Sequence, residues 1–124
     1  MPRERGSSGP DDRIRIQHML EAAKDSHAFV AGRSRADLDS DVMLFRALRN
    51  ALQEIGEAAA RVSDEGLNRA AMVPWGQIVA MRNVLVHVYF GVDKERVWKT
   101  ATEDIPILLT QLELACKDWP LPSP

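Results

Sequence analysis

The chain has 124 residues, of which 16 are basic and 18 are acidic, so its formal net charge at pH 7 is −2. Because domains commonly contain roughly 100–200 residues, this length predicts a single domain and leaves no room for a separate cofactor domain. Hydrophobic residues make up 45% of the chain, which is enough for a packed core and excludes a chain that is disordered over its whole length. The slightly negative net charge gives no sign of a broad nucleic-acid-binding surface.

The first predicted helix follows an N-terminal tail. Residues 1–10 (MPRERGSSGP) are rich in Pro, Gly, Ser and charge, which predicts a disordered tail. Asp11 or Asp12 can then cap a helix. The seam of this helix consists of residues at helical spacing: Ile16, Met19, Leu20, Ala23, His27 and Val30. Residues 31–40 contain Gly, Ser and Asp, so we expect a loop there with one helical turn after Ser34.

The second predicted helix is the longest and covers residues 40–64. Its apolar residues recur every three or four positions, which is typical of a helical bundle: Val42, Phe45, Leu48, Leu52, Ile55, Ala59 and Val62. Gly56 and the alanines at 58–60 are small and would let a neighbouring helix approach closely. Residues 65–73 show a less regular pattern and lead to the next helix.

The third predicted helix covers residues 74–90. Pro74 suits its first turn, and Gly91 suits its C-terminal cap. One side of this helix carries the residues that we expect in the core: Ile78, Met81, Leu85 and Val88.

A fourth predicted helix begins at Asp93, its expected cap, and contains Val97, Trp98 and Ala101. Pro106 lies inside the apparent continuation and predicts a kink or break near residues 103–105. The last helical stretch has its own apolar seam: Ile105, Leu108, Leu109, Leu112 and Ala115. The sequence therefore predicts an all-α bundle of four or five helices over residues 11–119, followed by a disordered Pro-rich tail at 120–124.

Several classes of protein do not fit this chain. Its longest apolar run, at residues 84–90, is interrupted by His87 and is far shorter than the roughly 18–20 residues of a membrane span. Cys116 is the single cysteine, so we expect neither an internal disulfide nor a cysteine-based zinc site. There is no P-loop, GxGxxG or HExxH pattern and no N-terminal signal segment. We therefore expect a cytoplasmic protein without a cofactor, a metal or a membrane partner.

Residues that can carry out chemistry gather in the third predicted helix, whose segment 81–91 reads MRNVLVHVYFG. Arg82, Asn83, His87 and Tyr89 are polar or amphipathic groups on an otherwise apolar helix. A solvated helix face with a core histidine would also explain this composition. The chain contains 12 Arg but only 4 Lys, and arginine is the side chain that makes planar, bidentate contacts with phosphate.

The spacing of these residues limits how one helix can use them. At 3.6 residues per turn, Arg82 and His87 lie about 140° apart around the axis and about 7.5 Å apart along it. Asn83 and His87 share a face because they are four residues apart. Arg82 and His87 can converge if the helix distorts, or if two copies of the chain meet about a two-fold axis and line one cleft from both sides.

The segment 82–89 (RNVLVHVY) resembles the RX4HXY motif of the HepT toxins, which belong to the HEPN superfamily. The surrounding sequence blocks agree with this resemblance: EIGEAA at 54–59, VPWG at 73–76, MRN at 81–83, YFG at 89–91 and VW at 97–98. The similarity covers about residues 12–119, nearly the whole predicted domain. RX4H alone is a weak signal, but RNxxxHxYFG together with the two upstream blocks is specific.

The resemblance implies an all-α HEPN bundle of four to five up-and-down helices that forms a homodimer. It implies the toxin of a type VII-like toxin–antitoxin pair, acting as a metal-independent endoribonuclease on RNA. The implied partner is a small nucleotidyltransferase antitoxin of the MNT type, which transfers AMP from ATP to the motif tyrosine, here Tyr89. In such families the modified tyrosine blocks the RNase cleft.

The motif residues suit these roles chemically. Histidine has an ordinary pKa of about 6.5, so His87 can act as both base and acid near neutrality. Arg82 stays protonated and offers several donors to phosphate oxygens. Asn83 can support catalysis by orienting His87 or by hydrogen bonding to the substrate. An AMP group on Tyr89, two residues beyond His87, would obstruct the cleft.

The same residues are compatible with two other functions. One is a non-catalytic HEPN subunit that binds nucleotide or RNA within a nucleotidyltransferase complex. The other is a purely structural helical bundle.

Overall fold

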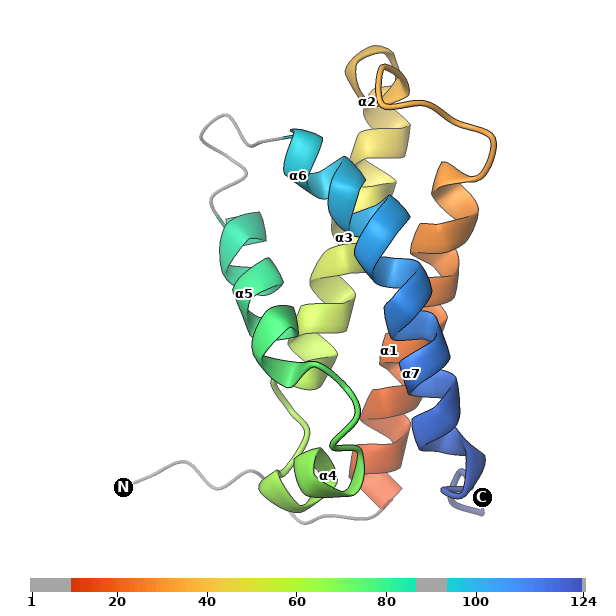
Figure 1. Cartoon of the computed structure of the whole chain (residues 1–124), viewed down its shortest axis with the longest axis vertical. Coiled ribbons are helices and arrows are strands. Elements are labelled where there is room, and N and C mark those ends of the chain that lie inside the picture. The colour runs from red at the N-terminus through yellow and green to blue at the C-terminus, as the bar shows by residue number, and fades with distance from the viewer. Residues whose placement is uncertain (1–9, 87–93, 124) are drawn as a thin grey trace.

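The computed structural model describes residues 10–86 and 94–123, and every regular element in these ranges is a helix (Figure 1). The four longest are α1 (Pro10–Val30), α3 (Val42–Ala59), α5 (Trp75–Val86) and α7 (Ile105–Lys117). Three short helices connect them, namely α2 (Asp37–Ser40), α4 (Asp64–Arg69) and α6 (Lys94–Lys99). The all-α prediction is confirmed for the described residues. Within them, no helix is long and apolar enough to cross a membrane.

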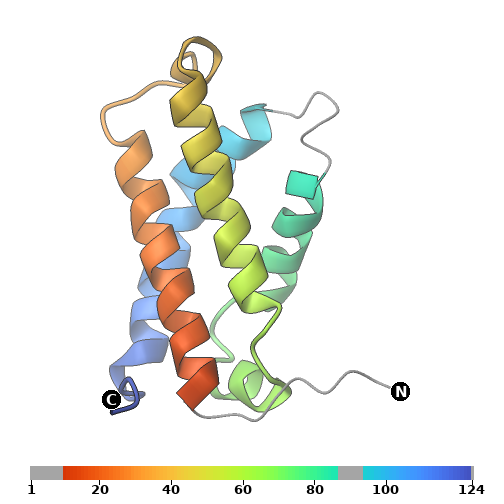
Figure 2. The same ribbon diagram turned by 180° about the vertical axis from the view of Figure 1, so that it is seen from behind.

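The helices form an up-and-down arrangement in which α1 packs against both α3 and α7. α5 packs against α3 and lies apart from α1 (Figures 1 and 2). α6 continues through a π-helical turn at Thr100–Asp104 into α7, so residues 94–117 form one long, irregular helix. The predicted loop over residues 31–40 contains the single turn of α2, and Gly32 adopts the positive φ of 72° that favours glycine just after α1.

The core follows the helical seams that the sequence predicts, with a few departures. The buried residues that confirm the seams include Ile16, Met19, Leu48, Leu52, Ile55, Ile78, Leu85, Val97, Ile105 and Leu112. His27 is exposed, and the buried residue at this place in α1 is its neighbour Ser26. Val42 is 59% exposed because α3 begins there, after its cap residue Asp41.

The start of α1 differs from the prediction. Asp11 and Asp12 both lie in the first turn of α1, so neither is the residue that precedes the helix. Asp12 is buried, and its carboxylate accepts hydrogen bonds from the Ser63 backbone N–H at 2.8 Å and from the Ser63 hydroxyl at 2.5 Å. Ser63 in turn caps α4, a helix that the irregular pattern at 65–73 did not predict.

The predicted distortion before Pro106 takes the form of a widened turn rather than a break (Figure 1). The Ile105 N–H donates to the carbonyl of Thr100, five residues back, which is the hydrogen bond of a π-helix. Pro106 has no N–H to donate to the carbonyl four residues before it, so the regular α pattern cannot run through this turn. The chain therefore stays helical through this turn, with a local change of helical pitch.

The C-terminal end of α7 is fastened to the start of α1. Trp119 is buried, and its backbone carbonyl accepts a hydrogen bond from the Arg13 guanidinium. The Arg69 guanidinium lies 4.3 Å from the centroid of the Trp119 ring, within the range of a cation–π contact. Three segments far apart in the sequence therefore meet at this end of the bundle.

Candidate functional site

Helix α5 carries the described part of the predicted site. Ile78 and Leu85 bury one side of the helix in the core. The Trp75 indole N–H donates to the Ala70 carbonyl at 3.1 Å, which ties the start of α5 to the end of α4. Arg82 and Asn83 are both exposed, although Arg82 comes four residues after Ile78 and three before Leu85 and therefore borders the buried side.

Arg82 packs against α3 at Gly56. A Cβ atom placed on Gly56 would stand 2.9 Å from the Cβ, 3.1 Å from the Cγ and 3.4 Å from the Cδ of Arg82. The aliphatic stem of Arg82 therefore occupies the space that a side chain at position 56 would need. This contact confirms the prediction that small residues in α3 let a neighbouring helix approach closely.

The guanidinium of Arg82, unlike its aliphatic stem, is not held by contacts with the described residues. Its guanidinium makes no hydrogen bond or ion pair with any residue in the described ranges, and the residue is exposed. By contrast, Arg33 and Arg35 are each paired with two carboxylates. A stem held by packing and a head open to solvent suit a group that binds a phosphate from outside.

His87 and Tyr89 lie outside the described residues, as do the C-terminal part of the predicted third helix and Gly91. The structure therefore shows Arg82 and Asn83 as exposed, consecutive residues of α5, with the stem of Arg82 against α3. The convergence of Arg82 with His87 stays a prediction from the sequence.

The residues that follow the motif are anchored to the N-terminal part of α3. The Lys94 ammonium lies 5.3 Å from the centroid of the Phe45 ring and 3.3 Å from a carboxylate oxygen of Asp39. The Arg35 guanidinium approaches the Glu95 carboxylate to 2.7 Å. The start of α6 is thus held against α2 and α3, while Arg82 rests on α3 nearer to its C-terminal end.

A pocket of about 230 Å³ lies between α5 and the long helix that begins with α6. Met81 and Leu85 line it from α5, and Arg96, Thr100 and Asp104 line it from the other side. No pattern in the sequence predicts this pocket, because its walls come from two helices whose separation depends on the packing of both against the core.

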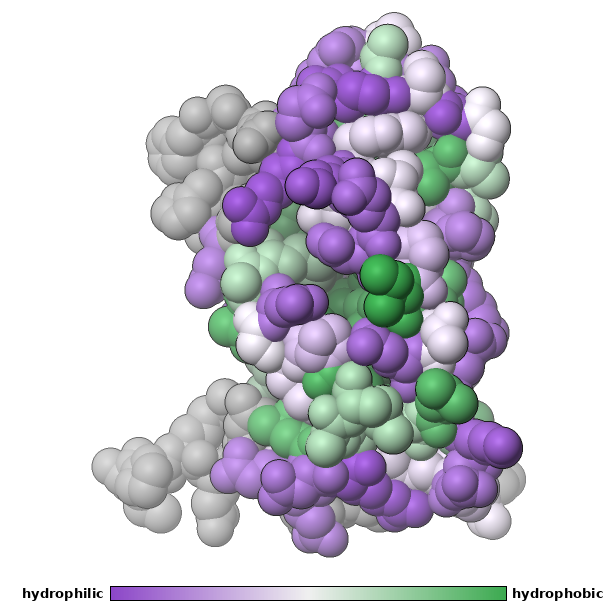
Figure 3. All heavy atoms as spheres, in the orientation of Figure 1, coloured by the Kyte–Doolittle hydropathy of each residue, from purple (hydrophilic) through white to green (hydrophobic). Residues whose placement is uncertain are grey.

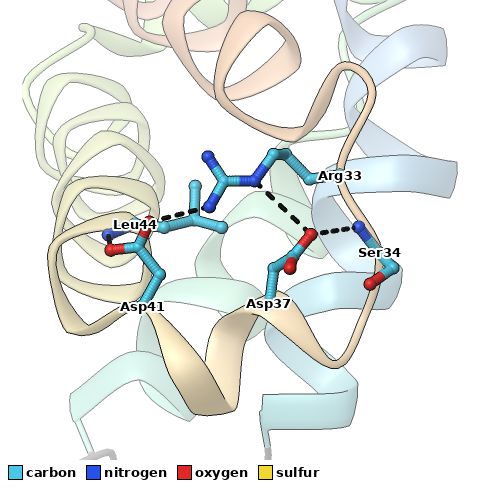
Figure 4. Close-up of polar contacts among 5 residues, drawn as sticks. All are labelled: Arg33, Ser34, Asp37, Asp41 and Leu44. Carbon is cyan, nitrogen blue, oxygen red and sulfur yellow. Dashed lines mark hydrogen bonds and ion pairs between the residues drawn. The ribbon is translucent and has the colours of Figure 1, made fainter.

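A second charged cluster surrounds α2 and is shown in Figure 4. The Arg33 guanidinium donates to the carboxylates of Asp37 at 3.4 Å and Asp41 at 2.7 Å. The backbone N–H of Ser34 and the charge of Arg33 lower the pKa of Asp37. Arg33 and the backbone N–H of Leu44 lower the pKa of Asp41, which also caps α3. This cluster fastens the loop between α1 and α3.

The remaining groups that could take part in chemistry are dispersed. His18 and His27 are both exposed on α1. In the described ranges no three His, Cys, Asp or Glu side chains come together as a metal site would require. Cys116 is a free, half-buried thiol, and burial raises its pKa.

Comparison with known proteins points to one family. The family model described as Ribonuclease HepT-like matches residues 19–115, which include the whole segment 82–89. The chain is 31% identical over 99 residues to a provisionally named RNase of Methanocaldococcus jannaschii, an alignment that covers 80% of this chain and 91% of that protein.

Two further relatives come from other organisms. A provisionally named RNase of Caldanaerobacter subterraneus is 35% identical over 98 residues, covering 79% of this chain and 88% of the relative. A protein of Thermococcus cleftensis that is provisionally named ribonuclease HepT is 40% identical over 67 residues, covering 54% of this chain and 61% of the relative. No solved structure matches the chain.

Proposed function

This chain belongs to the HepT-like ribonuclease family, and we propose that it is a metal-independent endoribonuclease in which His87 and Arg82 carry out catalysis. The observation that carries the proposal is the state of Arg82. It is exposed, its stem is packed against α3, and its guanidinium has no partner within the described part of the chain. A fixed cation of this kind suits a phosphodiester substrate.

The proposed reaction uses the nucleophile that RNA itself carries. The 2′-hydroxyl attacks the adjacent phosphorus, a P–O bond forms there, and the bond from phosphorus to the 5′-oxygen breaks. A neutral His87 accepts the proton of the 2′-hydroxyl, and a protonated His87 donates a proton to the departing 5′-oxygen. Arg82 stabilises the additional negative charge on the phosphorane oxygens. Asn83 supports the reaction by orienting His87 or by hydrogen bonding to the substrate.

A homodimer would supply both protonation states at once. If two copies of α5 meet about a two-fold axis, Arg82 and His87 of both chains line one cleft, and one histidine can act as the base while the other acts as the acid. This arrangement would also overcome the spacing of Arg82 and His87 on a single helix.

We further propose that the chain is the toxin of a type VII-like toxin–antitoxin pair. Its partner would be an MNT-type nucleotidyltransferase that moves AMP from ATP to the Tyr89 hydroxyl and releases pyrophosphate. The adduct is bulky and anionic, so it would obstruct the cleft and could also pair with Arg82.

The central experiment compares the wild-type chain with His87→Ala. Each protein is expressed without an antitoxin, and cell growth and RNA integrity are followed. The purified proteins are then assayed on a defined RNA without added metal and with a chelator. We expect His87→Ala to lower the cleavage rate by about 10²–10⁴-fold, the usual contribution of acid–base catalysis.

The matched control is His27→Ala, which removes an exposed histidine from α1 and should leave cleavage unchanged. Equal activity of wild type and His87→Ala would contradict the catalytic role of His87. RNA binding without cleavage, unaffected by His87→Ala, would instead support the non-catalytic HEPN subunit as the function of this chain.

A further inference from the structure

We propose that Gly56 is a positioning residue for Arg82, because the missing side chain at position 56 sets how closely Arg82 lies against α3. This inference rests on the proposed function, since it assigns Arg82 to the reaction. It concerns Gly56 on α3, a helix on which no catalytic residue is predicted.

The geometry leaves no room for any other residue at position 56. A Cβ atom at Gly56 would have the Cβ of Arg82 as its nearest neighbour, at 2.9 Å, a separation that real Cβ atoms essentially never show. Rotation of the Arg82 side chain cannot relieve this contact, because the position of a Cβ atom is set by the backbone. α5 itself would have to move away from α3.

The lower helix propensity of glycine also indicates that a glycine at position 56 serves the contact with Arg82. Gly56 is a buried residue in the last turn of α3, and in a helix glycine is less favourable than alanine because it loses more backbone freedom on folding. Its benefit lies in the close approach of Arg82, whose head is left free of any partner among the described residues. The stem is thus fixed while the guanidinium remains available to a phosphate.

Displacement of α5 would act on the reaction more than on binding. Arg82 would move outward, and so would the part of the chain that leads to His87. Misplacement of catalytic groups by about 1 Å can cost about 10²-fold in rate. We therefore expect Gly56→Ala to lower kcat by about 10- to 100-fold with little change in KM.

Two other glycines provide matched controls. A Cβ at Gly76, on α5 itself, would meet nothing within 4 Å, so Gly76→Ala should leave kcat unchanged and should not lower the melting temperature. A Cβ at Gly66, in α4, would lie 2.6 Å from a carboxylate oxygen of Asp12. Gly66→Ala should therefore lower the melting temperature but leave kcat per folded molecule unchanged.

A double-mutant cycle tests the contact without relying on activity. Gly56→Ala is made in the wild-type chain and in Arg82→Gly, which removes the opposing Cβ. We expect Gly56→Ala to lower the melting temperature relative to Gly76→Ala in the wild-type background, and to lose this effect in the Arg82→Gly background. A Gly56→Ala chain that folds poorly would thus be rescued by Arg82→Gly.

The outcomes separate this inference from the proposed function. A wild-type chain that cleaves RNA, together with a Gly56→Ala variant of unchanged kcat, would overturn the positioning role. Equal thermal effects of Gly56→Ala in both backgrounds would overturn the contact. A wild-type chain that does not cleave RNA, or an Arg82→Ala variant of full activity, would overturn the proposed function, and the thermal cycle would still decide whether Gly56 and Arg82 press on each other.

Discussion

Arginine side chains show at the residue scale how the same group serves structure and, by our proposal, chemistry. Arg13 donates to the Trp119 carbonyl, Arg33 binds two carboxylates, and Arg69 covers the Trp119 ring. These contacts account for part of the excess of arginine over lysine, because a planar guanidinium can donate in several directions and stack on a ring. Arg82 lies within the family motif and keeps its head exposed.

The proposed modification of Tyr89 is also a prediction at this scale. When the chain is mixed with the proposed nucleotidyltransferase partner and ATP, intact-mass spectrometry should show the addition of AMP units. The gain should disappear in Tyr89→Phe, which lacks the accepting hydroxyl, and should persist in His87→Ala, which keeps it. A mass gain that remains in Tyr89→Phe would show that another residue is modified.

At the element scale, some helices follow from local sequence patterns and others depend on contacts between residues that are distant in the sequence. The positions of α1, α3, α5 and α7 follow from apolar residues at helical spacing, which is a local property. α4 depends on Ser63, which caps it, and on the buried carboxylate of Asp12 from another helix. The turn at Thr100–Asp104 depends on Pro106, whose effect on the helix was predicted although its π-helical form was not.

The cluster around α2 leads to a prediction on pH. Because the folded-state pKa values of Asp37 and Asp41 are lowered, these groups stabilise the fold above the ordinary carboxylate pKa, and this stabilisation is lost as the pH falls through the lowered values. Arg33→Ala should remove much of it, so the variant should melt at a lower temperature than wild type at pH 7.

Thermal melting between pH 7 and pH 2 checks this expectation. The difference between wild type and Arg33→Ala should shrink once the pH falls below about 4. High salt should also reduce the difference, because these groups are exposed. A difference that stayed constant down to pH 2 would show that Arg33 acts through packing rather than charge.

At the scale of the whole molecule, exposed apolar residues indicate where the proposed dimer interface lies. Hydrophobic and hydrophilic residues are interspersed on the face shown in Figure 3. Val79 is 47% exposed, and it neighbours the exposed residues Arg82 and Asn83 on the surface of α5, three and four residues later. An interface that brought two copies of this side together would cover Val79 and join the two sets of motif residues.

Sedimentation or light scattering tests this prediction. The wild-type chain should have a mass near twice 13.9 kDa, and Val79→Glu should reduce it to that of one chain, because a buried, unpaired charge opposes association. RNA cleavage should fall with the loss of the dimer. Leu114→Glu, at a 55% exposed site on α7, is the matched control and should remain dimeric. A wild-type monomer, or a Val79→Glu dimer, would contradict this interface.

The sequence by itself determined the helical class, the approximate ranges of the long helices, the irregularity before Pro106 and the motif that identifies the family. It also predicted a close helix approach at Gly56. These features depend on residues a few positions apart, where helical periodicity and proline chemistry act directly.

Only the tertiary structure decided which side chains meet across the bundle. Asp12 and Ser63 are 51 positions apart, and Arg13 and Trp119 are 106 apart, so no local pattern could pair them. For the same reason the sequence predicted Arg82 as a candidate but could not say that its stem rests on Gly56. Burial of the apolar seams sets the distance between α3 and α5, and that distance determines which atoms touch.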